Sequence, residues 1–428
     1  GASVPKKRVS VVFPTHWDQR QLESCRSRWG EAFEITFESP SDDDCPDTFA
    51  ILEYIDEVAS RADAMDGVFS SSDYPGATVA GAIANRRGLP GPAPEHVIGC
   101  SHKFYSRCTQ QAVAPEATPW FGLVDPKNPD PNLPFPVFLK PVKGAFSQLA
   151  RRIASHEALL DFVRRPAATE FFAHYMRIFD QLVVGLTDFE HDGQFFIAEG
   201  VLAGDQTTVE GFIRDGEVKL LGIVDSILHP VTRSFVRFDY PSALPCEVQA
   251  RMEQIASDVI RASGLEQSFF NIEMIHDPSS GSIHILEVNP RICGQFADLY
   301  EKVDGRNTYE IALELVTGQV PEVPRGAGLY PCAASVPLRT YRPVKVLATP
   351  DDARLRSLES AYPGLLLWLE CEPGQVLADF ERVEDGQSCR YAVMNLGADS
   401  LDTLHARVRE IEDAAGIRLE PLGDCGPT

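Results

Sequence analysis

The stretch Gln267-Ser-Phe-Phe-Asn-Ile-Glu-Met-Ile-His276, followed by Gly281-Ser-Ile-His-Ile-Leu-Glu-Val-Asn-Pro-Arg291, decides the fold of this chain. Both segments alternate with a period of two, and the four residues between them, 277–280, are typical of turns. The sequence therefore predicts a β-hairpin. One of its faces needs a hydrophobic core, because it carries Phe270, Ile272, Met274, Leu286 and Val288 with His284 as the one polar exception.

The opposite face of the hairpin is polar at its outer end. A turn centred on Ser280 would place Glu273 opposite Glu287, and Asn271 opposite Asn289. Two like charges that face each other destabilise a sheet, whereas a divalent cation between them would stabilise it, and Mg²⁺ prefers such oxygen ligands. The alternative is a hairpin with one solvated face. It is weakened by three isoleucines that the alternation places on the same face, Ile275, Ile283 and Ile285.

Glu273 together with Glu287-Val-Asn-Pro-Arg291 resembles the metal-binding signature of the ATP-grasp carboxylate–amine ligases. The resemblance implies that Glu273, Glu287 and Asn289 hold Mg²⁺ (or Mn²⁺) on the phosphates of ATP. It also implies that Arg291 is catalytic and steadies the transferred phosphoryl group. Where that family usually has two glycines after the arginine, this chain has Ile292-Cys-Gly294.

The same resemblance assigns nucleotide-binding roles to residues earlier in the chain. It implies lysines on the phosphates, a mobile phosphate loop after the second lysine, a hinge strand that meets adenine and an acid near the nucleotide. These residues are Lys103, Lys140, Ser147, Glu199, Val201 and Glu210. Taken alone, each lysine is more typical of a solvated helix or strand end. Glu210 alone is equally typical of a solvated strand face.

The first hundred residues alternate between strand and helix patterns, which predicts a small parallel α/β domain. Its strand-end loops, 14–16 and 70–76, lie where such sheets bind ligands. Ser101 is expected to cap a helix that begins there. The whole chain is predicted to be α/β (α+β multidomain), with an N-terminal pre-ATP-grasp domain (1–100), an ATP-grasp domain with its hinge near 199 (101–320) and a C-terminal β-rich capping domain (321–428).

Residues 225–240 have no clear period and are predicted to form an irregular polar loop. Such loops carry specificity more often than scaffolds do. His229, Arg233 and Arg237 are therefore weak candidates for a substrate site, with the two arginines gripping a carboxylate. The alternative is a surface loop with ordinary charges.

The composition limits the classes of partner. The chain of 428 residues is 44% hydrophobic, 24% charged and has a net charge of −23, so nucleic acid and anionic membranes are not expected partners. The 10 cysteines form no Cys-x-x-Cys pair, which favours reduced thiols in a cytoplasm. No apolar run approaches the length of about 20 residues that spans a membrane. The chain begins without Met, so the sequence leaves open whether the native protein has a leader peptide.

The resemblance thus implies an ATP-dependent ligase that joins a small-molecule carboxylate to an amine. It would proceed through an acyl phosphate and give ADP and phosphate, with amino-acid-like substrates and a homodimer as expectations. Two alternatives stay open. One is another ATP-grasp reaction, such as carboxylation or thioester formation, and the other is a non-catalytic nucleotide-binding regulator.

Overall fold

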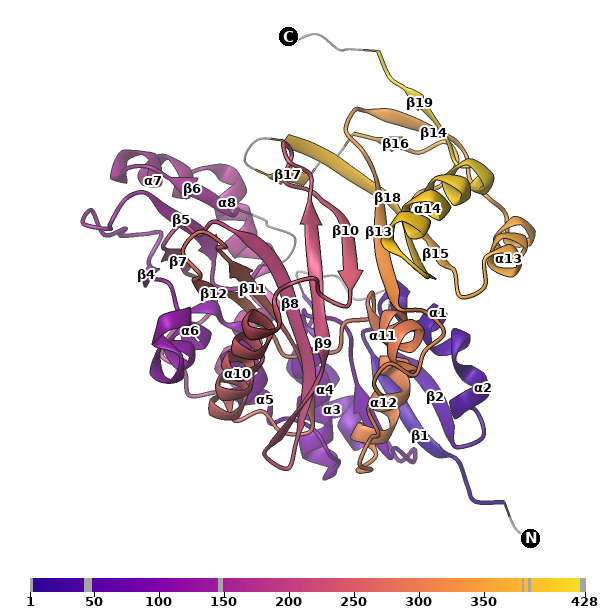
Figure 1. The fold of residues 1–428 in the computed structure, drawn as a ribbon. Coiled ribbons are helices and arrows are strands. Elements are labelled where there is room, and N and C mark those ends of the chain that lie inside the picture. Colours follow the sequence, from indigo (N-terminus) through magenta and orange to yellow (C-terminus); the bar gives the residue numbers. More distant parts are fainter. Residues whose placement is uncertain (1–2, 42–47, 145–148, 379–380, 384–385, 424–428) are drawn as a thin grey trace. The chain divides into compact units, whose positions relative to one another are not determined.

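The computed structural model describes residues 3–41, 48–144, 149–378, 381–383 and 386–423. It divides into two units (Figure 1). The first contains residues 1–222, 244–294 and 309–322, and the second contains residues 223–243, 295–308 and 323–428. The predicted division into three domains stays a prediction.

The first unit begins with a three-stranded parallel sheet, as the sequence predicted. Strand β1 (Lys7–Val12) lies between β2 (Phe33–Glu38) and β3 (Gly67–Phe69). Its helices are α1 (His16–Ser24), α2 (Arg26–Trp29), α3 (Ile51–Ser60) and α4 (Gly76–Arg87). The loop 70–76 that follows β3 therefore leaves the sheet at its carboxyl edge, where ligands usually bind.

Two short helices follow, α5 (Pro94–Ser101) and α6 (Lys103–Val113), and then a 3₁₀ turn η1 (Pro115–Ala117). The expectation that Ser101 caps a helix was wrong. Pro94 starts an earlier helix, for which its fixed φ is well suited, and Ser101 is the last residue of that helix. The Ser101 hydroxyl donates to the Val97 carbonyl at 2.9 Å, and His102 takes the cap position of α6.

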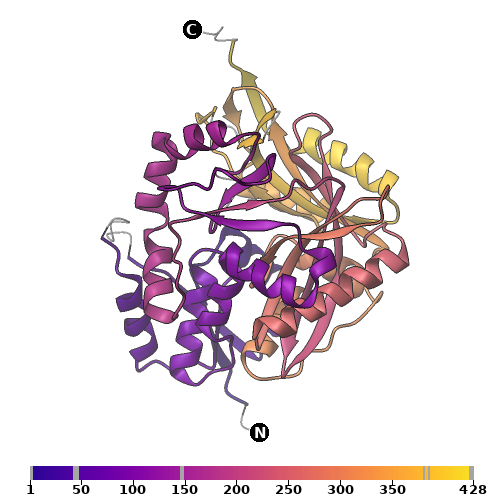
Figure 2. The same cartoon turned by 90° about the vertical axis from the view of Figure 1, so that its left-hand side faces the viewer.

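A four-stranded antiparallel sheet forms the next layer, in the order β4 (Phe121–Val124), β7 (Phe196–Glu199), β5 (Val137–Pro141), β6 (Arg151–Ile153). Helices α7 (His156–Val163), α8 (Pro166–Glu170) and α9 (Arg177–Leu186) and the π-helix η2 (Phe171–Tyr175) connect β6 to β7. This purple and magenta part of the chain faces the viewer in Figure 2. On its two central strands, Lys140 pairs with Ile197 and Glu199 pairs with Phe138, so Lys140 and Glu199 lie on neighbouring strands two residues out of register.

The largest sheet begins in the first unit with the order β12 (Ile283–Asn289), β11 (Ser268–His276), β8 (Asp205–Arg214), β9 (Glu217–Leu228). Helix α10 (Cys246–Ser263) packs against β8 and β11. Helix α12 (Thr308–Val316) returns to this unit at residue 309. Strand β12 is the edge of the sheet, so the outward carbonyl groups of β12 need partners from elsewhere.

The hairpin of β11 and β12 has the predicted register at its outer end. Glu273 pairs with Glu287, and Asn271 pairs with Asn289. The register then shifts between Glu273 and Met274, because β12 contains one extra residue, Leu286. A bulge of this kind reverses the faces that follow it.

The bulge corrects the predicted faces near the turn. Ile283 and Ile285 were expected on the face of the glutamates, and His284 on the apolar face. Beyond the bulge, Ile285 pairs with Met274 and lies on the core side, fully buried, while His284 pairs with Ile275. The polar face is therefore less interrupted by isoleucine than simple alternation indicates.

Gly211 on β8 provides a test of how closely this sheet is packed. It pairs with Phe270, and a Cβ atom there would lie 2.4 Å from the Lys219 carbonyl oxygen and 2.7 Å from the Phe270 ring. Gly211→Ala should therefore lower the free energy of unfolding by about 1–3 kcal/mol. Urea unfolding measures this loss. Gly99→Ala on α5 is the control, because its nearest neighbour would lie 3.6 Å away, and it should cost nothing.

The second unit continues the sheet from β9 through β10 (Phe235–Tyr240), β13 (Cys332–Thr340), β18 (Gly386–Ala398) and β15 (Leu366–Leu369), with β17 (Glu381–Val383) paired to β18. A second sheet has the order β16 (Val376–Leu377), β14 (Val344–Ala348), β19 (Arg418–Pro421). The helices are α11 (Ala297–Asp304), α13 (Asp352–Ala361) and α14 (Leu401–Ala415). The expected β-rich C-terminal region with a helix is present.

The prediction that residues 225–240 are irregular was wrong. Strand β9 continues to Leu228, and β10 pairs with both β9 and β13. Only 229–234 lie outside strands. The strand pattern was present in the sequence, because Phe235, Val236, Phe238 and Tyr240 are residue types that favour strands. Pairing with β13, about 100 residues later in the chain, completes the strand.

Among the described residues, no helix is long and apolar enough to cross a membrane. The eight cysteines that the structure describes are free thiols.

Candidate nucleotide and metal site

The two facing carboxylates of the hairpin are the centre of the candidate site. Burial and the neighbouring Glu287 raise the pKa of Glu273. Burial alone would also raise the pKa of Glu287, but the ammonium groups of Lys103 and Lys140 hold that pKa below its usual value. Ionising both of two neighbouring buried carboxylates has a high cost in free energy. A cation between them would remove this conflict.

A chain of amide hydrogen bonds orients Asn289 on the same face. The Asn271 amide nitrogen donates to Glu210 Oε2 at 3.0 Å, and the Asn289 amide nitrogen donates to Asn271 Oδ1 at 3.2 Å. The Asn289 amide nitrogen is thereby engaged by Asn271, while the amide oxygen is the atom that a cation would need.

This donor set fits Mg²⁺ or Mn²⁺ bound together with a nucleotide. Among the described residues, no group of three or more His, Cys, Asp or Glu side chains is arranged to hold a metal. Glu273, Glu287 and Asn289 instead supply two carboxylates and one amide. Mg²⁺ usually takes one or two carboxylates and completes its shell with phosphate oxygens and water. The set is incomplete for a structural metal and suitable for a metal–nucleotide complex.

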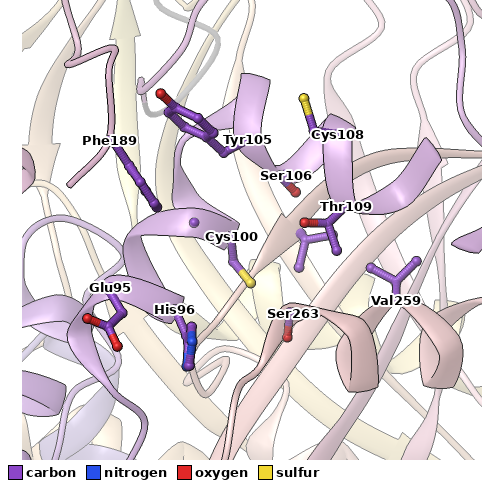
Figure 3. A pocket seen from close by; sticks show the side chains of 12 residues that line it. Glu95, His96, Cys100, Tyr105, Ser106, Cys108, Thr109, Phe189, Val259 and Ser263 are labelled. Atoms are coloured by element: carbon purple, nitrogen blue, oxygen red, sulfur yellow. The ribbon is translucent and has the colours of Figure 1, made fainter. Parts of the chain in front are cut away.

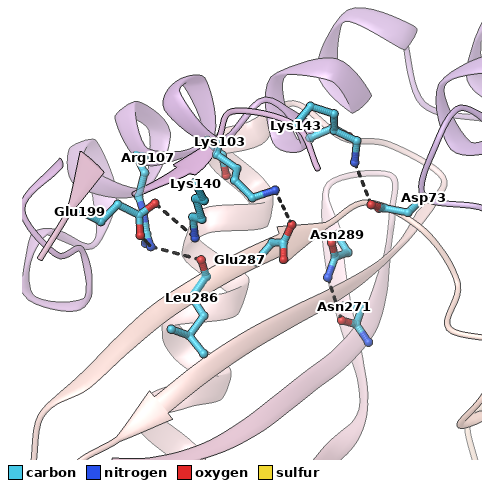
Figure 4. Close-up of polar contacts among 12 residues, drawn as sticks. Asp73, Lys103, Arg107, Lys140, Lys143, Glu199, Asn271, Leu286, Glu287 and Asn289 are labelled. Carbon is cyan, nitrogen blue, oxygen red and sulfur yellow. Dashed lines mark hydrogen bonds and ion pairs between the residues drawn. The ribbon is translucent and has the colours of Figure 1, made fainter. Parts of the chain in front are cut away.

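Two predicted lysines lie beside carboxylates of the site, as Figure 4 shows. Lys103 Nζ is 2.8 Å from Glu287 Oε1, and Lys140 Nζ is 3.4 Å from Glu199 Oε1. Burial lowers the pKa of Lys140 in spite of Glu199, whereas the attraction of Glu287 outweighs burial and raises the pKa of Lys103. Both lysines are only slightly exposed, at 10% and 15%. Partly desolvated ammonium groups of this kind bind phosphate strongly.

Arg291 lies beside an acid that sequence reasoning did not single out. Arg291 Nε is 3.5 Å from Asp73 Oδ1, and the buried Lys143 Nζ is 2.7 Å from Asp73 Oδ2. Burial would raise the pKa of Asp73, but Lys143 and Arg291 hold it well below its usual value. The available signal was the position of Asp73 in loop 70–76, at the carboxyl edge of the parallel sheet.

Arg107 was also missed, and it is the most connected side chain of the site. It is 1% exposed. Its guanidinium donates to both oxygens of Glu199, at 3.3 and 2.7 Å, to Gln110 Oε1 at 2.8 Å, and to the carbonyls of Ile285 and Leu286 at 2.6 and 3.1 Å. The sequence contains one weak signal for it, since Arg107 follows Lys103 by four residues and so lies on the same helix face.

The remaining predicted residues are placed as follows. Val201 lies two residues after Glu199 and is 48% exposed. Ser147 lies outside the described residues. Glu210 is buried and contacts Asn271, so the structure connects it to the hairpin amides.

The three substrate candidates belong to the second unit. Arg237 forms a two-pronged ion pair with Asp239, with distances of 2.6 and 3.0 Å. His229 Nδ1 accepts from the backbone nitrogens of Val231 and Thr232. Arg233 has a positive φ of 59°. Their role in substrate binding stays a prediction.

A separate apolar pocket of about 360 Å³ lies between α5, α6 and α10 (Figure 3). The described residues that line it include none of those predicted to bind nucleotide or metal. They include Tyr105, Phe189, Val259 and Val288, together with the thiols of Cys100 and Cys108. The polar cluster on the hairpin is therefore the better candidate for phosphate chemistry.

His102, which precedes Lys103, gives the structure a testable acid sensitivity. Burial lowers the pKa of His102 to about 4 from an ordinary 6.5, although its Nε2 contacts the Asp192 carbonyl at 2.8 Å. Between these pH values the unfolded chain binds the proton that the folded chain does not. Stability should therefore fall as the pH falls from 6.5 to 4, by up to about 1.4 kcal/mol per pH unit from this group.

His102→Gln should flatten this part of the stability profile, measured by urea unfolding at a series of pH values. His16→Gln, at an exposed position, is the control and should keep the original slope. An unchanged slope in His102→Gln would contradict the assignment.

Known proteins share the fold of this chain. Residues 133–298 match the family model described as an ATP-grasp domain. No curated protein matches the chain. An L-amino acid ligase from Bacillus licheniformis has a similar structure, with a TM-score of 0.72 at 16% identity, over 98% of this chain and 100% of that one.

Two further solved structures extend the comparison to other reactions. Phosphoribosylglycinamide synthetase from Anaerococcus prevotii has a TM-score of 0.62 at 16% identity, covering 97% of this chain and 100% of that chain. Biotin carboxylase from Campylobacter jejuni, solved as a β-γ-ATP complex, has a TM-score of 0.63 at 15% identity. The match covers 97% of this chain and 93% of that chain. At these identities the likeness shows the shared fold.

Proposed function

Because the chain contains an ATP-grasp domain at residues 133–298 and has the fold of the ATP-grasp ligases, we propose that it joins a carboxylate to an amine at the expense of ATP. The carboxylate would be an amino acid or a related small acid. The products would be an amide, ADP and phosphate.

The observation that carries this proposal is the pairing of Glu273 with Glu287 beside three cationic side chains. The chain as a whole has a net charge of −23, yet this hairpin face is surrounded by Lys103, Lys140 and Arg291. Such a concentration of buried positive charge in an acidic protein is suited to a polyanion such as the ATP phosphates. The paired carboxylates and Asn289 would then hold the cation that accompanies these phosphates, and this cation would neutralise charge that develops during phosphoryl transfer.

The reaction divides into two transfers. In the first, a carboxylate oxygen of the substrate attacks the γ-phosphorus of ATP, and the bond to the β-phosphate oxygen breaks to release ADP. In the second, the amine nitrogen attacks the carbonyl carbon of the acyl phosphate, phosphate leaves, and the nitrogen loses a proton. Arg291 would stabilise the transferred group in both steps. Its ion pair with Asp73 and its partial exposure support this role.

The roles of the other residues follow from their chemistry. Lys103 and Lys140 would contact the ATP phosphates as point charges. The backbone after Glu199, at Val201, would meet the adenine edge, and Ser147 would belong to the phosphate loop. His229, Arg233 and Arg237 would contribute to binding of the acid substrate. The proposed enzyme would be an intracellular homodimer.

A carboxylation is the second candidate, because biotin carboxylase shares the fold over nearly the whole chain. In that reaction bicarbonate would take the place of the carboxylate, and the same phosphate site would serve. The two candidates differ only in the acid and the acceptor.

A panel assay tests the proposal. The protein is incubated with MgATP and pairs of amino acids, or with bicarbonate and single amines, and ADP and phosphate are measured. ADP formation that requires an organic acid and an amine supports the ligase. ADP formation that requires bicarbonate supports carboxylation, and hydrolysis that needs no acceptor would contradict both.

A further inference from the structure

The Arg107 guanidinium joins the two sheets of the candidate site. Through Glu199 it contacts the end of β7 in the four-stranded sheet, and through the Ile285 and Leu286 carbonyls it contacts β12 in the largest sheet. Figure 4 shows Arg107 between the Glu199 carboxylate and the Leu286 carbonyl. All these residues belong to the first unit.

The contact with β12 occurs at the bulge. Leu286 is the extra residue that shifts the register between Glu273 and Met274. Without this register shift, the pairing of the turn-proximal half, in which Met274 pairs with Ile285, would continue outward, and Glu273 would pair with Leu286 instead of Glu287. The bulge thus brings the two carboxylates opposite each other. Because β12 is the sheet edge, its bulged carbonyls have no neighbouring strand, and Arg107 supplies their donors.

The contact with Glu199 extends to Lys140. Glu199 Oε1 is 3.3 Å from Arg107 Nε and 3.4 Å from Lys140 Nζ, so one carboxylate is shared by both cations. Burial would raise the pKa of Glu199, but Lys140 and Arg107 keep it below the usual value. The position of the Lys140 ammonium therefore depends on where Arg107 holds Glu199.

We infer that Arg107 is a positioning residue that sets, at the same time, the Lys140 ammonium and the Glu287 carboxylate of the metal–nucleotide site. The guanidinium is almost completely buried, so it acts through these neighbours and not on a ligand. A lysine cannot replace it, because one ammonium cannot span a carboxylate and two carbonyls in the planar arrangement that these partners require. The inference deepens the proposed function and rests on it, since it assumes that the site binds a metal–nucleotide complex.

The test uses binding, which needs no knowledge of the substrates. ADP binding to the full chain is measured by calorimetry over a series of Mg²⁺ concentrations. Arg107→Lys should weaken ADP binding and raise the Mg²⁺ concentration needed for half-maximal affinity, each by about 10–100-fold, which is the usual effect of losing a group that orients metal ligands.

A second variant separates the two arms of Arg107. Glu199→Gln removes the charge that holds Lys140, while Arg107 can still donate to the amide oxygen and to the β12 carbonyls. It should weaken ADP binding but leave the Mg²⁺ requirement near that of the wild type. Arg87→Lys is the matched control, because Arg87 also donates to backbone carbonyls, of Ala59, Arg61 and Asp63, and neither ADP affinity nor Mg²⁺ requirement should change.

The possible outcomes distinguish this inference from the proposed function. If the wild type shows no Mg²⁺-dependent ADP binding, the proposed function itself fails. If the wild type binds and Arg107→Lys keeps the same Mg²⁺ requirement, the positioning role of Arg107 is overturned. If Arg107→Lys does not fold, Arg107→Ala with added guanidinium ion provides the measurement, and restoration of the Mg²⁺ requirement by guanidinium is expected. A lack of restoration in folded Arg107→Ala would contradict the inference.

Discussion

Glu287→Gln should abolish nearly all turnover, by about 10³-fold, while the protein still folds. The substitution removes a charged metal ligand, and with it part of the neutralisation of the ATP phosphates. It also removes the repulsion between Glu287 and Glu273 that raises the pKa of Glu273. The same change leaves the Lys103 ammonium without the carboxylate that lies 2.8 Å away, so the two effects on stability oppose each other and stability should change much less than activity.

The measurement combines turnover, Mg²⁺-dependent nucleotide binding and thermal unfolding of the same preparation. Glu190→Gln is the control, since this side chain is 88% exposed, and it should leave all three quantities unchanged. Near wild-type activity and binding in Glu287→Gln would remove the hairpin from the proposed site.

Arg291→Ala should lower kcat by about 10³-fold and change the affinity for MgATP much less. An arginine that meets the transferred phosphoryl group acts mainly when charge develops on it, and losing such a contact commonly costs this much. A fall in kcat without a matching rise in KM is the signature of an interaction made in the transition state. Pre-steady-state measurement of ADP formation separates this step from product release.

A second arginine variant is the control for this prediction. Arg164→Ala, on the exposed end of α7, controls for the general loss of an arginine. If Arg291→Ala instead raised the KM for ATP in proportion to the loss of kcat/KM, Arg291 would be a ground-state phosphate contact and the assigned role would be wrong.

The outer register of the hairpin could be predicted because alternating side chains and turn residues at 277–280 limit which residues face each other. The structure reaches this register through a shift within β12. The bulge at Leu286 could not be predicted in this way. It depends on a donor, Arg107, that lies about 180 residues earlier in the chain, and alternation cannot report such a long-range partner.

Long-range contacts and local signals that were overlooked both explain the other differences. Asp73 and Lys143 meet across 70 residues of sequence, and nothing local to either residue indicates the other. Strand β10 was missed because it contains the charged Arg237 and Asp239, although its other four residues are aromatic or β-branched and favour a strand. Ser101 was placed at a helix start because serine is a common cap, whereas Pro94 had already begun a helix that ends there. A distant partner thus explains the first difference, while the signals for β10 and α5 were present in the sequence.

The identity of the nucleotide product tests the central claim most directly. The protein is supplied with MgATP, its carboxylate substrate and hydroxylamine in place of the amine, and all products are quantified. An acyl phosphate route predicts ADP, phosphate and the hydroxamate of the carboxylate in equal amounts, since hydroxylamine traps the activated acid. AMP and pyrophosphate would instead show that the carboxylate is activated as an adenylate, and would contradict the assignment of Arg291 and the paired glutamates to the terminal phosphates.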